Sequence, residues 1–315
     1  MTDPKEPPWV SSDMPALVFV NCSAGRGRAR TYLPRMRDLF ESLDVSAQFV
    51  ETGSAPELES AARQALAQGQ RVLLAMGGDG TFQALVNGVF GSDAVVGILP
   101  TGGGNDFAAA LGLPGNPLRA AEGVLKGKPR SVDLVSVRVA DGRTRLYAGG
   151  GGMGLDAEAA LHASGAYRHL PGRLRYIASA PRALSEHLPL KVRLEFPGTD
   201  VPPVEAISLL TGVLNTPTYG AGLRLAPNAR IDDGMLQVVM MEDLNTLGVL
   251  KLIPRLLGSG ELRASQVKRW NVKSLRICTD RPRLFHGDGE ILGPAPVEIE
   301  VVPSAVQVLA PTEEG

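Results

Sequence analysis

The chain has 315 residues, of which 44% are hydrophobic and 21% charged, a composition typical of a globular protein large enough for two domains. Its formal net charge of −1 provides no overall positive field, which argues against nucleic-acid binding. Two cysteines far apart in the sequence argue against a disulfide framework and fit a reducing compartment.

Residues 1–15 are polar and proline-rich and lack the apolar core of a signal peptide. No stretch of the chain approaches the roughly 20 apolar residues that a membrane-spanning helix needs. We therefore expect a cytoplasmic protein.

The first third of the chain alternates strand and helix patterns. A helix is predicted over 31–43, where Pro34 is tolerable only if the helix begins just before it. Ser54 and Glu57 have the spacing of a capping box before a second helix, and a third helix is predicted over 81–90. Apolar strands are predicted at 16–21, 46–51, 71–76 and 94–100. This alternation predicts a parallel sheet covered on both faces, with ligands bound beyond the carboxyl ends of the strands.

After about residue 130 the pattern changes to strands separated by turns, with two helical stretches near 171–188 and 245–257. The pattern favours a mainly antiparallel, sandwich-like second domain. The predicted fold class is therefore α/β, with an N-terminal parallel-sheet domain at 14–136 followed by a mainly β domain at 137–311.

A glycine-rich turn at 77–81 lies between a predicted buried strand and a predicted helix. Glycine permits positive φ angles and close approach of a ligand, and the helix presents free N–H groups at its positive end. Thr81 is placed to cap this helix. The carboxylate of Asp79 would repel a bare phosphate, so its presence indicates a metal ion between them. The alternative is a tight strand–helix connection that binds nothing.

The same arrangement recurs one strand later in GILPTGGGNDFAAAL. Gly102 to Gly104 form the turn, and Asn105 and Asp106 stand where a helix cap belongs. In a parallel sheet both turns lie at one edge, where they would suit a polyphosphate with Mg²⁺. Neither turn has the G-x-x-x-x-G-K-[ST] pattern of a P-loop.

These motifs resemble those of a known family. GGDGTFQALVNG (77–88) and PTGGGNDFA (100–108) resemble the signatures of the diacylglycerol kinase catalytic domain, whose superfamily includes sphingosine kinases, ceramide kinases and soluble bacterial lipid kinases. The resemblance continues, in order, through NCSAG (21–25), VDL (132–134), GGGMGLDA (150–157), APNARIDDGMLQV (226–238) and HGDGE (286–290). It implies an NAD kinase/diacylglycerol kinase-like first domain, ATP and Mg²⁺ as cofactors, and phosphorylation of a lipid hydroxyl with the nucleotide between the two domains.

The resemblance also implies where the nucleotide binds. The family has a threonine where this chain has Gly103, so one nucleotide-binding hydroxyl is missing, and Cys22 replaces the usual proline after the asparagine. The implied contacts fall on Asn21, Thr52, Gly77, Gly78, Asp79, Gly80, Thr81, Gly102, Gly103 and Asn105.

Three aspartates, Asp79, Asp106 and Asp133, match a family set that organises Mg²⁺ and water near the phosphates. Carboxylates are preferred Mg²⁺ ligands, and Mg²⁺ neutralises charge as the γ-phosphoryl group moves. The alternative for Asp106 is a helix cap alone, and for Asp133 a turn residue at a strand edge.

Glu290 matches the family's catalytic glutamate, with Asp288 as a supporting residue. A lipid hydroxyl must lose its proton as it attacks phosphorus, and a positioned carboxylate can accept that proton. The alternative is an ordinary hairpin turn built on Asp-Gly.

The segment RIDDGML (230–236) matches a second, structural Mg²⁺ site of the bacterial members. The resemblance implies a carboxylate from Asp233 and backbone carbonyls from Arg230 and Met235; the alternative is an Asp-Asp-Gly turn. The four histidines show no metal-ligand spacing and are interpreted as solvated or core residues.

Two basic segments bear on membrane contact. Residues 166–188 combine Arg168, Arg173, Arg175 and Arg182 with apolar residues, a pattern that can dock on anionic headgroups. Five arginines within 26–37 form a second cluster, which could instead meet nucleotide phosphates. An ordinary solvated helix face is the alternative for both. We expect a lipid substrate at the membrane surface, peripheral association with the inner face of the membrane, and a monomer or homodimer.

The preferred interpretation is thus a lipid kinase that converts diacylglycerol to phosphatidic acid, with sphingoid bases, other glycerolipids and prenols open as acceptors. One alternative is a kinase of a soluble substrate resembling NAD kinase, which is not expected to carry the DGE motif (288–290). The other is an inactive lipid- or nucleotide-sensing module, against which the intact Asp79, Asp106 and Glu290 argue.

Overall fold

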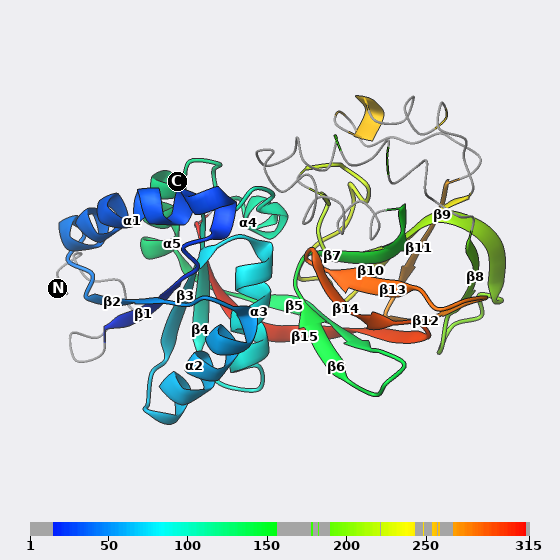
Figure 1. Cartoon of the computed structure of the whole chain (residues 1–315), viewed down its shortest axis with the longest axis horizontal. Helices are drawn as coiled ribbons and strands as arrows, with labels where there is room; N and C mark the ends of the chain where they lie inside the picture. The colour runs from blue at the N-terminus through cyan, green and yellow to red at the C-terminus, as the bar shows by residue number, and fades with distance from the viewer. Residues whose placement is uncertain are drawn as a thin grey trace. The chain divides into compact units, whose positions relative to one another are not determined.

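A computed structural model describes residues 15–155, 190–220, 222–242 and 267–312, with isolated positions between them at 178, 182, 248, 254–256 and 258. The chain divides into two compact units, residues 1–132 with 304–315 and residues 133–303 (Figure 1). Strands β5 (Lys128–Arg138) and β15 (Val297–Ala310) run from one unit into the other. Among the helices of the described part, none is long and apolar enough to cross a membrane.

The first unit is built on a parallel sheet with the strand order β15-β4-β3-β1-β2. Strand β3 is buried at every position, as expected for a central strand covered on both faces. This arrangement confirms the predicted parallel sheet. The other strands are β1 (Ala16–Val20), β2 (Ala47–Glu51), β3 (Val72–Gly77) and β4 (Val95–Pro100).

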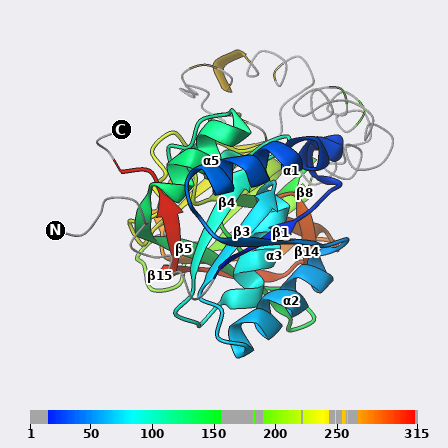
Figure 2. The same cartoon turned by 90° about the vertical axis from the view of Figure 1, so that its left-hand side faces the viewer.

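Helices cover both faces of this sheet. Helices α1 and α5 lie on one face, and α2 and α3 lie on the other (Figures 1 and 2). The predicted apolar stripe of α3 is confirmed, since Phe82, Leu85 and Val86 are fully buried. The helices are α1 (Ala24–Ser42), α2 (Ala55–Ala67), α3 (Asp79–Val89), α4 (Asp106–Ala110) and α5 (Pro117–Leu125).

The predicted start of the first helix is wrong. Helix α1 is assigned from Ala24, although Gly25, Arg26 and Gly27 have φ angles of 58°, 64° and 86°, so regular right-handed helix begins only after them. Pro34 therefore lies inside the helix rather than in its first turn. In the sequence, Gly25 and Gly27 favour a loop. In the structure they form only a short left-handed segment, and the right-handed helix starts directly after it.

The second unit is mainly antiparallel, which confirms the predicted fold class. Strands β13 and β14 form a hairpin; β13 pairs with β7, and β7 pairs with the long strand β9. The strands are β6 (Thr144–Tyr147), β7 (Gly150–Gly154), β8 (Leu190–Glu195), β9 (Val204–Leu214), β10 (Leu236–Glu242), β11 (Val267–Val272), β12 (Ser274–Thr279), β13 (Leu284–Gly287) and β14 (Glu290–Pro294).

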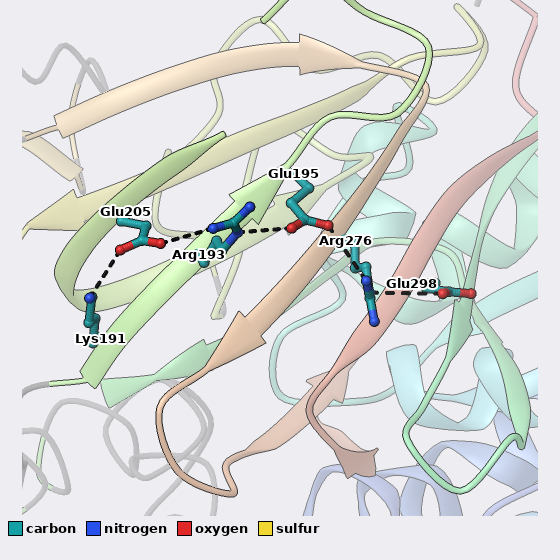
Figure 3. A network of polar contacts seen from close by, with 6 residues as sticks. All are labelled: Lys191, Arg193, Glu195, Glu205, Arg276 and Glu298. Carbon is teal, nitrogen blue, oxygen red and sulfur yellow. Dashed lines mark hydrogen bonds and ion pairs between the residues drawn. The ribbon is translucent and has the colours of Figure 1, made fainter. Parts of the chain in front are cut away.

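Strand β8 shows how the sequence alternation sets the two faces of this unit. Leu190, Val192 and Leu194 are buried in the core, while Lys191 and Arg193 between them are exposed. The exposed side chains continue onto neighbouring strands as a charge ladder, seen in Figure 3. The ladder consists of Lys191, Glu205, Arg193, Glu195, Arg276 and Glu298, joined in that order by contacts of 2.9 to 4.0 Å.

Part of the sequence interpretation falls outside the described residues. The helical stretches near 171–188 and 245–257 lie almost entirely there, as do Arg168, Arg173 and Arg175. The histidines at 162, 169 and 187 lie there as well.

Candidate active site

Three chain segments of the first unit meet where strands β1, β3 and β4 end. Asn21, directly after β1, donates from Nδ2 to Thr81 Oγ1 at 3.2 Å. Arg28 donates to the carbonyl of Gly102 at 3.3 Å, and a Cβ on Gly25 would collide with the carbonyl oxygen of Thr101. The residues predicted to bind a nucleotide in this unit thus gather at the carboxyl edge of a parallel sheet, the usual ligand position in such folds.

The two glycine turns interlock through their backbones. The carbonyl of Gly77 accepts the N–H groups of both Thr101 and Gly102, at 2.8 and 3.0 Å. A Cβ on Gly102 would lie 2.5 Å from the Cα of Gly78, far too close for any real side chain. Glycine is therefore required in the turns because one backbone passes directly against the other.

Asp79 joins the turns through its side chain. One carboxylate oxygen accepts the N–H of Asp106 at 3.3 Å, and the other accepts the N–H of Phe107 at 3.1 Å. Asp79, in the first turn of α3, therefore caps the neighbouring helix α4 across 27 positions of sequence.

The caps predicted from the local sequence are wrong in two places. Helix α3 follows Gly78 without a side-chain cap, and the Thr81 hydroxyl accepts from Asn21 instead. Asn105 precedes α4 in the left-handed conformation, with φ of 60°, and its side chain donates to the carbonyl of Gly102. The N–H groups at the start of α4 go to Asp79, so neither Asn105 nor Asp106 caps that helix with its side chain.

The environment of Asp79 favours its neutral form. Burial is the main cause and the nearby carboxylate of Asp106 adds repulsion, and together they raise the pKa of Asp79 to about 6. The backbone N–H groups of Asn105, Asp106 and Phe107 act in the opposite direction by stabilising the carboxylate. A cation beside the two aspartates would relieve their repulsion.

The turns also offer backbone donors for an anion. Within the described residues, the N–H groups of Gly78, Asp79 and Gly80 at the start of α3 make no hydrogen bond, nor do those of Gly103 and Gly104. Such donors at a helix N-terminus attract phosphate oxygens. The hydroxyl that a threonine would supply at position 103 is missing, as the sequence indicates.

Thr52, the remaining predicted nucleotide contact, follows the end of β2. It is buried, with 7% of its surface exposed, and its N–H donates to the carbonyl of Val20 at 2.9 Å. It therefore lies at the same carboxyl edge of the sheet as Asn21 and the two glycine turns.

The carboxylates of this unit fit Mg²⁺ shared with a phosphate better than a site made by protein alone. In the part of the chain that the structure describes, no three His, Cys, Asp or Glu side chains come close enough to hold a metal. Asp79 and Asp106 are two neighbouring carboxylates beside free backbone donors. Mg²⁺ in phosphoryl-transfer enzymes is commonly held by one or two carboxylates, with phosphate oxygens and water completing the shell.

In the second unit, Asp288 anchors the tip of the β13–β14 hairpin. Its carboxylate accepts three backbone N–H groups, those of Ala148, Gly149 and Gly150, at 2.9 to 3.1 Å. Asp288 and Gly289 have φ angles of 50° and 87°, as a two-residue type I′ turn requires. The expected Asp-Gly hairpin is present, and Asp288 attaches it to the chain before β7.

Glu290, the candidate base, is the first residue of β14, directly after this turn. The residue is exposed, yet partial burial of its carboxyl group raises its pKa above the usual value. A carboxylate with a raised pKa is a better proton acceptor while it is still ionised near neutral pH.

Asp133 and the 230–236 loop contact each other. Asp133 is buried, donates its N–H to the carbonyl of Ile231 at 2.7 Å, and accepts the N–H of Gly234 on its carboxylate at 2.6 Å. Asp233 accepts the N–H of Met235 at 3.0 Å, and the Arg230 side chain pairs with a neighbouring aspartate. Asp133 thus braces the loop, which has the turn geometry of the Asp-Asp-Gly alternative.

Sequence reasoning missed two residues next to these groups. Asn215 is fully buried and donates from Nδ2 to the carbonyls of Asp133 and Ala148, both at 3.0 Å. Tyr219 bonds to His286, which is itself buried. Both follow strand β9 in NTPTYG, a turn-rich stretch that gives no local signal of burial.

Comparison with known proteins agrees with these two units. Residues 15–137 match the diacylglycerol kinase catalytic domain, and residues 149–310 match the YegS C-terminal NAD kinase beta sandwich-like domain. A crystal structure of a diacylglycerol kinase from Bacillus anthracis superposes with a TM-score of 0.69 at 20% identity, over 94% of this chain and 96% of the other. At that identity the likeness concerns the fold.

Relatives in sequence carry the comparison further. A diacylglycerol kinase from Mycobacterium tuberculosis is 31% identical over 260 residues, which cover 82% of this chain and 83% of the relative. A diacylglycerol kinase from Bacillus subtilis is 25% identical over 303 residues, covering 95% of this chain and 97% of the relative. With both family domains matched in order, this chain belongs to the family of diacylglycerol kinases and YegS-like lipid kinases.

Proposed function

We propose that this kinase transfers the γ-phosphoryl group of ATP to the hydroxyl of a membrane lipid, with diacylglycerol as acceptor and phosphatidic acid as product. The observation that carries the proposal is the interlocked pair of glycine turns, which places two neighbouring carboxylates beside free backbone N–H groups. The names of the M. tuberculosis and B. subtilis relatives support diacylglycerol as the acceptor.

In this proposal the first unit holds the nucleotide. The N–H groups of Gly78 to Gly80 and of Gly103 would donate to phosphate oxygens, and Asp79 and Asp106 would hold Mg²⁺. Mg²⁺, when bound, neutralises the charge that builds on the phosphates as the phosphoryl group moves. Asn21 keeps Thr81 and the first turn in place from the side of β1.

Glu290 of the second unit accepts the proton of the lipid hydroxyl. As that proton leaves, the hydroxyl oxygen forms a bond to the γ-phosphorus, and the bond to the bridging oxygen of ADP breaks. Asp288 holds the turn before Glu290 through three N–H groups and does not itself accept the proton. Asp133 and Asp233 brace the 230–236 loop, where a second Mg²⁺ would be held by the Asp233 carboxylate.

A lipid acceptor requires that the kinase work at a membrane surface. We propose peripheral binding to anionic lipid on the cytoplasmic side, supported in the described part by exposed Arg26, Arg30, Arg35 and Arg37 along α1. Co-sedimentation with anionic vesicles, compared with neutral vesicles, measures this binding. Equal binding to both vesicle types would contradict an electrostatic attachment.

The decisive experiment is a phosphorylation assay with labelled ATP, Mg²⁺ and a panel of acceptors, with the products separated by chromatography. The panel contains diacylglycerol, a sphingoid base, a prenol and, as the soluble alternative, NAD⁺. Glu290→Gln is compared with Glu300→Gln, an exposed strand glutamate that serves as the matched control.

We expect labelled phosphatidic acid from the wild type and from Glu300→Gln. Glu290→Gln should bind ATP normally but turn over about 10² to 10⁴ times more slowly, the usual effect of losing a general base. Phosphorylation of NAD⁺ with no lipid product, or turnover of Glu290→Gln within about threefold of the wild type, would overturn the proposal.

A further inference from the structure

The hairpin that carries Glu290 is attached to the glycine-rich strand β7 along one edge. His286 and Gly287 of β13 pair with Gly152 and Gly151. The backbones run so close that a Cβ on Gly151 would lie 2.5 Å from the carbonyl oxygen of His286. The ladder between β13 and β14 shifts register between Phe285 and His286, directly before the turn.

The extra residue at that register shift is Leu292 of β14, because Phe285 pairs with Gly293 and His286 with Ile291. A bulge leaves one residue outside the regular ladder and bends the strand locally. The hairpin ladder is therefore irregular at the step next to His286, and a side-chain contact at His286 adds a restraint beside this irregularity.

Tyr219 supplies such a contact. Its hydroxyl lies 2.5 Å from Nε2 of His286, and the two rings stack with centroids 5.8 Å apart and an interplanar angle of 28°. The ring of Tyr219 also packs on Gly150, where a Cβ would lie 2.7 Å from it. Tyr219 belongs to the segment after β9, which closes on itself through paired backbone bonds with Leu223. This one side chain thus connects three segments: the loop after β9, strand β7 and His286 of β13.

We infer that Tyr219 and His286 form a positioning pair for Glu290, holding β13 of the hairpin at His286 so that the carboxylate stays in place to receive the proton. The inference rests on the proposed function, in which Glu290 is the base. The pair itself has no assigned contact with substrate or nucleotide. His286 lies four residues before Glu290, and its side chain is 3% exposed. The bond to Tyr219 is partly buried, where a hydrogen bond is stronger than in water, and small displacements of a reacting group lower the rate steeply.

The test uses variants that alter little besides the bond. Tyr219→Phe keeps the ring against Gly150 and His286 and removes only the hydroxyl. His286→Leu removes the partner nitrogen, and His286→Gln restores a polar group that can pair with the hydroxyl. Ser208→Ala is the matched control, because it removes a buried hydroxyl bond of β9, to Thr211 at 3.0 Å, that does not touch the hairpin.

We expect Tyr219→Phe and His286→Leu each to lower kcat about tenfold with the KM for ATP unchanged. The double variant should be no slower than either single variant, because both remove the same bond. His286→Gln should recover most of the rate, and Ser208→Ala should keep a normal kcat even if its melting temperature falls.

Three results would overturn the inference. A normal kcat in Tyr219→Phe and His286→Leu, together with a low kcat in Glu290→Gln, would refute the positioning role of the pair. The proposed function would remain intact. A double variant about a hundredfold slower, the product of the two single effects, would show that the residues act independently. A fully active Glu290→Gln would overturn the proposed function and, with it, the role of the pair.

Discussion

Asp79→Asn should leave the stability of this kinase nearly unchanged at pH 7 and lower it clearly at pH 4. Asparagine keeps one oxygen for the N–H groups that start α4 but places an NH₂ group against the second N–H. A buried N–H left without a partner costs about 1 to 3 kcal/mol. The substitution also has a stabilising effect that opposes this loss. It removes a carboxylate whose ionised form is unfavourable in the folded protein.

The size of the opposing effect follows from the pKa. Asp79 shifts from 3.8 to about 6 on folding, which corresponds to about 3 kcal/mol at 1.36 kcal/mol per pKa unit. Between these two values the folded state binds the proton more tightly than the unfolded state, so the stability of the wild type falls as the pH rises through this window. Asparagine does not titrate, and the stability of the variant relative to the wild type should therefore rise by about 2 to 3 kcal/mol from pH 4 to pH 7.

Urea unfolding followed by circular dichroism at both pH values, with a chelator present, measures this difference. Asp38→Asn, on the exposed face of α1, controls for the change in net charge. The kinase activity of Asp79→Asn at pH 7, where the fold is intact, should still fall severely because a Mg²⁺ ligand is lost. A stability difference that is the same at pH 4 and pH 7 would refute the reasoning about Asp79.

Further predictions concern the turns, the hairpin and the charge ladder. Gly102→Ala should lower the unfolding midpoint and weaken ATP binding, because its Cβ would lie 2.5 Å from backbone, whereas Gly115→Ala, which has open space, should not. Asp288→Asn should slow turnover at least about tenfold, because three N–H groups lose a charged acceptor. Turnover should be lost on acidification at a pH above the ordinary range of glutamate, because Glu290 is active when ionised and its pKa is raised. Arg193→Ala should lower the unfolding midpoint only slightly, and by less still at high salt, because its ion pairs are exposed.

Each of these predictions has a clear contrary result. If Gly102→Ala and Gly115→Ala had the same ATP affinity and the same unfolding midpoint, the turns would tolerate side chains. Normal turnover in Asp288→Asn would make the three N–H bonds irrelevant to the base. Loss of turnover at the ordinary pKa of glutamate would contradict the partial burial of the Glu290 carboxyl group. A large drop in the unfolding midpoint of Arg193→Ala would make the ladder a far stronger network than exposed ion pairs usually are.

The elements that depend on local pattern were predictable from the sequence. The parallel sheet and the face of α3 follow from periodicities of two to four residues, which hold whatever the rest of the chain does. The caps of α3 and α4 were not predictable in the same way. Capping rules consider the residue next to the helix, whereas α4 is capped by Asp79, which comes from another turn.

The site was predictable to a similar degree. The glycine turns and the Asp-Gly hairpin have sequence signatures because each needs special backbone angles or close backbone contact. Tyr219 and Asn215 have no such signature, since their importance comes from partners more than 65 positions away in the sequence. Only the folded arrangement of β5, β7, β9 and β13 brings those partners together.

The return of β15 to the first unit affects how the protein is made. Gln307 and Val308 pair with Val95 and Val96 of β4, and a Cβ on Gly127 would collide with the carbonyl oxygen of Ala310. During synthesis from the N-terminus, the edge of β4 therefore lacks its partner strand until the whole second unit, residues 133–303, has been made, on the order of tens of seconds at ordinary elongation rates. Until β15 has been made, this open edge can pair with another chain, so a gene cut after residue 303 should give a protein that aggregates.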